Sequence, residues 1–264
     1  MSMDERPLVE MRDILKIFGE GTPDEMVLFD QFNFSIRRGE YISVVGSNGS
    51  GKTTMLNILC GSLPIEGGQV LLDGKDLKKL GEHQRAAFIG RVFQDPARGT
   101  CADLTVLENM ALAGNKGKPY NLRWGVDRKR VEGYRAMLEP LGLGLENRMN
   151  QQVGSMSGGQ RQALALLLCT MTPIDLLILD EHTAALDPRA ADTVMALTDQ
   201  LVREKGLTTL MVTHNLKYAV NHGTRLLMMH QGKAVIDASG PDRAKYSVDD
   251  LLDTFNQISI EVGN

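Results

Sequence analysis

Hydrophobic residues near the start of the chain alternate with polar ones in short segments. Phe32, Phe34 and Ile36 alternate with polar neighbours, which is the pattern of a strand with one buried face. A second apolar segment, residues 8–18, precedes it across the turn-rich residues 19–23. Two such segments joined by a turn predict an antiparallel β edge in this part of the fold.

Further along the chain, apolar residues form continuous runs without alternation. Residues 176–179 are such a run, which is typical of a parallel strand buried on both faces, and residues 41–45 and 209–212 are also expected to be strands. The helices expected between the strands span residues 52–60, 158–171 and 188–204. This succession of strands and helices predicts an α/β fold.

Residues 95–156 have a different character from the rest of the chain. Runs of β-branched residues are missing there, and helices are expected near 106–113 and 128–141, separated by Gly, Pro and Asn clusters. We interpret this segment as a helical subdomain inserted into the α/β fold. The expected organisation is an α/β core in residues 1–93 and 162–240, a helical subdomain in 94–161, and a short helical tail in 241–264.

Composition and charge narrow the possible functions. The 264 residues are 42% hydrophobic and 23% charged, which is ordinary for a globular protein. A formal net charge of -4 gives no strong positive field, so we expect no nucleic-acid partner. The most hydrophobic stretch, residues 163–179, is interrupted by Thr172, Pro173 and Asp175. A membrane-spanning helix needs about 20 mainly apolar residues, so none is expected.

A glycine-rich loop lies between the apolar run 41–45 and the helix expected at 52–60. Residues 46–53 read GSNGSGKT and match the G-x-x-x-x-G-K-[ST] pattern of a phosphate-binding loop. Such a loop turns its backbone N–H groups toward phosphate oxygens, while Lys52 adds a full charge and the Thr53 hydroxyl is suited to Mg²⁺. We expect nucleotide binding by Gly46, Ser47, Asn48, Gly49, Ser50, Gly51, Lys52, Thr53 and Thr54.

Two carboxylates, Asp180 and Glu181, directly follow the apolar run 176–179. Ligands of open α/β sheets collect at the carboxyl ends of the strands, where the phosphate-binding loop also stands. We therefore expect Asp180 to hold Mg²⁺ and Glu181 to polarise the water that attacks the γ-phosphate. The alternative interpretation is that both acids are merely solvated residues at a strand end. The phosphate-binding loop in the same chain disfavours it.

Further short motifs occur in the order of a known family. Residues 156–160 read MSGGQ and open a helix, and they resemble the LSGGQ signature of ATP-binding cassette (ABC) ATPases, with Met156 in place of Leu. Counting the phosphate-binding loop and the two carboxylates, the resemblance extends over residues 8–240. The residues that resemble the remaining motifs of this family are Phe18, Gln94, Asp187 and His214.

This resemblance implies a RecA-like phosphate-loop NTPase core that binds ATP with Mg²⁺ and hydrolyses the ATP. It implies that Phe18 stacks on adenine and that Gln94 contacts both the nucleotide and the metal. It also implies that His214 contacts the γ-phosphate and takes part in catalysis together with Glu181.

The resemblance further implies that two copies pair head to tail. Each ATP then lies between the Lys52 loop of one copy and the signature of the other, namely Ser157, Gly158, Gly159 and Gln160, with Asp187 nearby. A hydroxyl and bare backbone at a helix start also form an anion site on physical grounds. A twofold arrangement closes on itself, so a dimer is expected.

Some histidines depart from the motifs of the family. His182 stands where a proline usually follows the catalytic glutamate, and the resemblance does not indicate its effect. Neither this change nor Thr183 removes a phosphate or metal contact, so we expect active ATP hydrolysis. His83, His222 and His230 match no motif and are expected at the solvated surface.

A cassette with only a short tail resembles the ATPase subunits of bacterial importers. Separate permease subunits would then form the transport pathway, and a substrate-binding protein would deliver the solute to them. Residues 98–106, with Glu108 and Asn109, resemble ATPases of amino-acid importers, those for tryptophan or tyrosine among them. The resemblance therefore implies a place in the cytoplasm, on the inner face of the membrane. An exporter ATPase has the same motifs, and a non-membrane ABC ATPase is the alternative from another class.

Overall fold

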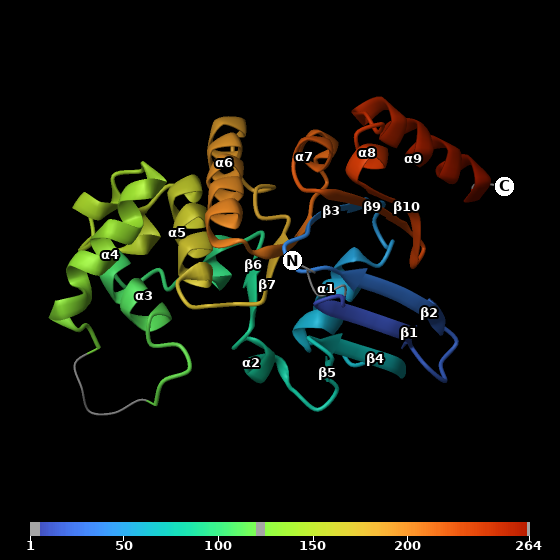
Figure 1. Ribbon diagram of the computed structural model, residues 1–264, viewed down its shortest axis with the longest axis horizontal. Coiled ribbons are helices and arrows are strands. Elements are labelled where there is room, and N and C mark those ends of the chain that lie inside the picture. Colours follow the sequence, from blue (N-terminus) through green and yellow to red (C-terminus); the bar gives the residue numbers. More distant parts are fainter. Residues whose placement is uncertain (1–5, 120–124, 263–264) are drawn as a thin grey trace. The chain divides into compact units, whose positions relative to one another are not determined.

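The computed structural model describes residues 6–119 and 125–262 (Figure 1). The chain forms two compact units. We call residues 1–86 with 206–264 the terminal unit and residues 87–205 the central unit, and we describe each by itself.

The terminal unit contains an antiparallel sheet in the strand order β2-β1-β4-β5 (Figure 1). Its strands are β1 (Val9–Phe18), β2 (Met26–Ile36), β4 (Gly67–Leu72) and β5 (Lys75–Asp76). In the register of β1 and β2, Met11 lies opposite Phe34 and Ile14 opposite Phe32, and all four side chains are buried. The hydrophobic residues of the alternating pattern thus lie on the buried face of the strand. The predicted antiparallel β edge is confirmed.

Parallel strands form the second part of the terminal unit. The buried strand β3 (Tyr41–Gly46) lies between β8 (Thr208–Val212) and β9 (Arg225–His230) and is parallel to both. The edge strand β10 (Lys233–Ser239) pairs antiparallel with β9. The helices of this unit are α1 (Lys52–Cys60), α2 (Glu82–Arg85), α7 (Leu216–Asn221), α8 (Gly240–Arg243) and α9 (Val248–Val262).

The central unit combines two parallel strands with a helical cluster. Its strands are β6 (Ile89–Val92) and β7 (Leu176–Asp180), and its helices are α3 (Val106–Ala113), α4 (Val131–Leu138), α5 (Gly158–Thr170) and α6 (Pro188–Lys205). One hydrophobic core joins the four helices through buried side chains such as Met110, Leu138, Leu164 and Val194. Burial of these side chains is the main reason that the short helices of this unit are stable.

One expected helix is wrong in its extent. Residues 128–141 form α4 flanked by two 3₁₀ turns, Arg128–Arg130 and Glu139–Leu141, instead of one helix. Pro140 lies in the second turn and has no N–H to continue an α-helical ladder. The Asp127 side chain accepts a hydrogen bond from the Lys129 N–H and so begins the first turn.

The α/β class is confirmed, because each unit contains parallel strands together with helices. The boundaries 1–93, 94–161, 162–240 and 241–264 rest on motif order and stay predictions. Within residues 6–119 and 125–262, none of the helices combines the length and the apolar character that a membrane crossing requires.

Candidate nucleotide-binding site

The loop of residues 46–51 connects β3 to α1 in the terminal unit and can exist only with glycine at two of its positions. A Cβ on Gly46 would lie 2.3 Å from the Met229 carbonyl oxygen of the neighbouring β9. Gly51 has φ +103°, and a Cβ there would lie 2.9 Å from the Phe29 ring. The backbone is therefore held in a tight curve at the start of α1, whose first N–H groups have no partner within the helix.

The Lys52 side chain lies over this curve and is only 5% exposed. Its Nζ donates hydrogen bonds to the Gly46 oxygen at 2.7 Å and to the Ser47 oxygen at 2.9 Å, and it lies 3.3 Å from the Ser50 Oγ. Asn48 and Thr53 are exposed and Thr54 is half-buried. The loop thus combines N–H groups, a helix N-terminus and a positive charge, which is the chemistry of an anion site.

His230 contacts this loop, and its expected place at the solvated surface is wrong. Its Nδ1 lies 3.3 Å from the Ser47 Oγ, and its Nε2 is buried without a hydrogen-bond partner in the described structure. The contact arises because β9 runs beside β3 and ends level with Gly46. His83 is exposed as expected.

The structure places two further predicted residues of the terminal unit. His214 is exposed and follows the end of β8, which runs parallel to β3, so it lies at the same sheet edge as the loop. Phe18 is half-buried at the end of β1, with the Lys16 Nζ 5.2 Å from its ring centroid. Its ring is therefore partly available for stacking.

In the central unit, Asp180 forms an ion pair that the sequence did not indicate. Arg91 Nη2 lies 2.6 Å from Asp180 Oδ2, and the two side chains are only 11% and 17% exposed. The guanidinium carbon of Arg91 is also 4.9 Å from the Phe93 ring centroid. The one signal in the sequence for this pair is that Arg91 is a charged residue within a short apolar strand.

Asp180 and Gln94 share a pocket of about 340 Å³ in the central unit. Because β6 and β7 are parallel, the residues that follow them meet at one edge, and Phe93, Arg98 and Ala185 also line this pocket. The structure thus brings together two of the three residues predicted to contact a metal.

The carboxylate that follows, Glu181, begins a tight turn. Glu181 has φ +50°, which is uncommon for a residue with a side chain, and its oxygen accepts a hydrogen bond from the Ala184 N–H. Strained residues of this kind concentrate at functional sites. His182 is 2% exposed, and its Nε2 lies 3.1 Å from the Thr198 Oγ1 on α6, which explains how this side chain is accommodated.

The signature residues form the N-terminus of α5. Ser157 and Gln160 form a capping box, in which the Ser157 Oγ accepts from the Gln160 N–H. A Cβ on Gly159 would lie 2.9 Å from the Ala190 Cβ, so glycine is needed here for packing against α6. Ser157 and Gly158 are exposed, and Asp187 caps α6 by accepting from the Ala190 N–H.

Replacing Arg91 by Met is expected to lower the free energy of unfolding by about 2 kcal/mol. This lies between the small effect of exposed pairs and the 3–5 kcal/mol of buried ones, since Asp180 would keep its charge in a half-buried place. Arg12→Met is a matched control, because Arg12 is 54% exposed in its pair with Glu10. Urea unfolding of the nucleotide-free protein measures both, and equal losses would contradict the assigned importance of the Arg91–Asp180 pair.

Comparisons with known proteins agree on one family. The sequence model of the family described as ABC transporter matches residues 29–184, more than half of the chain. The chain is 41% identical over 248 residues to a tyrosine transport ATP-binding protein of Clostridioides difficile, covering 94% of this chain and 98% of that one. It is 36% identical to a phosphonates import ATP-binding protein of Alcaligenes faecalis, covering 80% and 76%.

A solved structure agrees with the sequence comparisons. It is a dimeric ATP-binding cassette in a post-hydrolysis state with ADP and Pi, with a TM-score of 0.72 and 27% identity, covering 88% of this chain and 98% of that one. The family match, the relatives and the cassette fold lead to one conclusion. The chain belongs to the ABC transporter family and is an ATPase that binds and hydrolyses ATP.

Proposed function

We propose that this chain is the ATPase subunit of an importer for amino acids or a similar small solute, with an aromatic amino acid as the preferred solute. The observation that carries an energy-coupling role is the glycine-dependent curve of residues 46–51 with the Lys52 ammonium above it. The relatives described as tyrosine transport and phosphonates import proteins support the importer class and the small solute.

In this proposal the loop residues and Lys52 bind the phosphates of ATP. Thr53, Gln94 and Asp180 would hold Mg²⁺, which would supply neutralisation of phosphate charge. Their hydroxyl, amide and carboxylate oxygens suit this ion, and Asp180 already holds a cation in the guanidinium of Arg91. Among the described residues no group of three or more His, Cys, Asp or Glu could hold a metal ion.

The remaining roles concern catalysis and adenine. Glu181 orients and polarises the water that attacks the γ-phosphate, and His214 contacts that phosphate. Phe18 stacks on adenine with its half-exposed ring. These roles use one aimed carboxylate and fixed dipoles, which is what phosphoryl transfer requires.

We also propose that two copies bind ATP between them. Ser157, Gly158, Gly159 and Gln160 of one copy would face the nucleotide held by the other, with Asp187 beside them. The exposed start of α5 supports this role, and so does the dimeric state of the similar solved cassette. Binding by both copies would make dimer closure depend on ATP.

The partners proposed outside the dimer are integral permease subunits and, through them, a substrate-binding protein. Attachment to the permease would hold the chain on the cytoplasmic face of the membrane. An exporter ATPase and a non-membrane ABC ATPase stay as alternatives, and nucleic acid is not among the proposed partners.

Purification of the native protein from detergent-solubilised membranes tests this function. We expect an integral membrane protein to co-purify with it, and we expect proteoliposomes of that complex to accumulate an aromatic amino acid only with ATP on the side of this chain. Transport in the opposite direction would indicate an exporter. Recovery with ribosomes or DNA, without a membrane protein, would overturn the proposal.

A further inference from the structure

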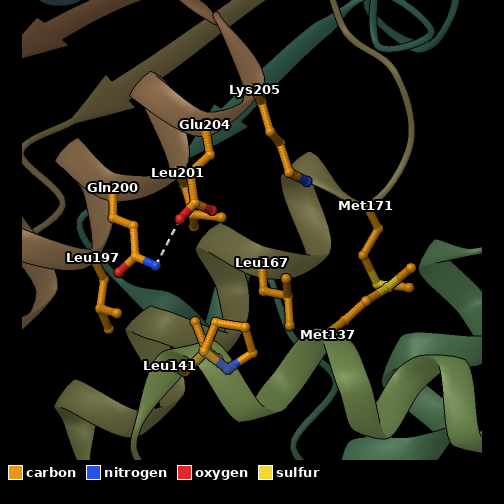
Figure 2. A pocket seen from close by; sticks show the side chains of 10 residues that line it. Met137, Leu141, Leu167, Met171, Leu197, Gln200, Leu201, Glu204 and Lys205 are labelled. Carbon is orange, nitrogen blue, oxygen red and sulfur yellow. Dashed lines mark hydrogen bonds between the residues drawn. The ribbon is translucent and has the colours of Figure 1, made fainter.

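A second pocket lies in the central unit, among helices α4, α5 and α6 (Figure 2). Its volume is about 250 Å³, which is below the range of roughly 300–1,000 Å³ that drug-sized ligands fill. The walls are mostly apolar, with Leu167 and Leu201 at the back and the thioethers of Met137 and Met171 at one side. Its size and its walls suit the apolar side chain of a small molecule.

The polar groups of this pocket all come from the last turns of α6. Gln200 Nε2 donates to Glu204 Oε1 at 2.9 Å, which orients the carboxylate on the rim (Figure 2). Lys205 Nζ donates to the Thr170 oxygen at 2.6 Å. An ammonium has three N–H donors and a carboxylate has several acceptor positions, so both groups keep capacity for a ligand.

Glu204 and Lys205 form no salt bridge with each other among the described residues. The Lys205 Nζ hydrogen-bonds to a backbone oxygen, and the Glu204 carboxylate to an amide. Burial lowers the pKa of Lys205, and the charge of the neighbouring Glu204 raises it in part. A carboxylate arriving at this ammonium would gain a charge-assisted hydrogen bond.

We propose that this pocket binds a free α-amino acid with an aromatic side chain. The ligand carboxylate pairs with Lys205, its ammonium pairs with Glu204, and its ring enters the apolar part of the pocket. The two methionine sulfurs at the wall favour an aromatic ring over an aliphatic chain. An apolar groove could take several kinds of occupant. The positive Lys205 and the negative Glu204 favour one that carries both charges, as a free amino acid does.

The position of the pocket suggests a regulatory use. Helix α5 begins at the Ser157 cap and ends beside Met171, which lines the pocket. An occupant would therefore contact the helix that carries the signature residues. The binding site itself needs neither ATP nor a permease, so it stands apart from the proposed transport function.

Isothermal titration calorimetry of the full chain without nucleotide tests the site, with L-phenylalanine and L-tyrosine as ligands. We expect saturable binding, weakened about tenfold in Lys205→Met and in Glu204→Gln, since each loses a charged hydrogen bond. 3-Phenylpropionate lacks the ammonium, so its binding should be weakened by Lys205→Met and unaffected by Glu204→Gln. Lys233→Met, at an exposed lysine of β10, is the control and should bind normally.

Several outcomes would overturn the proposal. Glu204 is exposed, so Glu204→Gln is expected to fold, and thermal unfolding checks this for every variant. Absence of binding by the folded starting protein at millimolar ligand would exclude the site. Equal binding of all variants would place the amino acid elsewhere. A change in self-association with Lys205→Met, without ligand binding, would make the pocket a contact between copies.

Discussion

Replacing Glu181 by Gln is expected to reduce steady-state ATP hydrolysis by roughly 10²–10⁴-fold, the usual contribution of a general base. ATP affinity should stay within about threefold, since Gln has the same size and the lost carboxylate is not assigned to bind ATP. The Glu181–Ala184 turn fixes the backbone at this position, and the substitution leaves that hydrogen bond in place. The expected variant therefore binds ATP but does not turn it over.

Two measurements separate this result from a folding defect. Phosphate release measures turnover, and sedimentation velocity with ATP and Mg²⁺ should show a dimer that persists in Glu181→Gln and decays in the starting protein. Glu132→Gln is the matched control, because Glu132 is 81% exposed and its ion pair in the described part of the chain is with Arg135 on its own helix. Normal phosphate release by Glu181→Gln would remove this residue from the catalytic role.

The sequence predicted those parts of the site that lie within one continuous segment. The residue types of segment 46–53 identify the loop, and Gly46 and Gly51 are required there because β9 and the Phe29 ring lie close to the backbone. The strands around the loop were also predictable, since buried parallel strands need continuous apolar runs. Local pattern and local structure agree at these places, as expected where short-range preferences support the fold.

The contacts that the sequence did not predict join distant segments. Arg91 meets Asp180, His230 meets Ser47, and His182 meets a threonine on α6. Each depends on which strands or helices become neighbours, and one sequence with its motifs does not contain that information. Strand pairing decides the first two contacts, because β6 pairs with β7 and β3 with β9.

The helical part shows a different limit of sequence reasoning. Two of the four helices of the central unit were expected from the loss of β-branched runs in residues 95–156 and two from the alternation of strands and helices, but their ends were not all predicted. Pro140 ends α-helical structure after α4, while the apolar pattern continues to Leu141. The pattern continues because Leu141 is buried in the same core as Leu138, so periodicity reports burial and not the type of helix.

Replacing Lys52 by Ala is expected to weaken ATP binding by about 10- to 100-fold, the loss of one or two charged hydrogen bonds to phosphate. The Lys52 ammonium is the only charge placed over the loop in the described residues 46–54, so no neighbour in this segment replaces it. Calorimetric titration with ATP and Mg²⁺ measures the change. Lys233→Ala removes an exposed lysine of the same unit and should leave the affinity unchanged.

Stability and charge must be separated at Lys52, because its Nζ also donates to the Gly46 and Ser47 oxygens. Lys52→Ala leaves these carbonyls without that donor, so part of the effect could come from the shape of the loop. Lys52→Arg keeps the charge but changes the geometry of the donors. If charge dominates, Lys52→Arg retains more affinity than Lys52→Ala, and thermal unfolding without ATP does not follow the same order. Undiminished affinity in Lys52→Ala would place the triphosphate outside the loop.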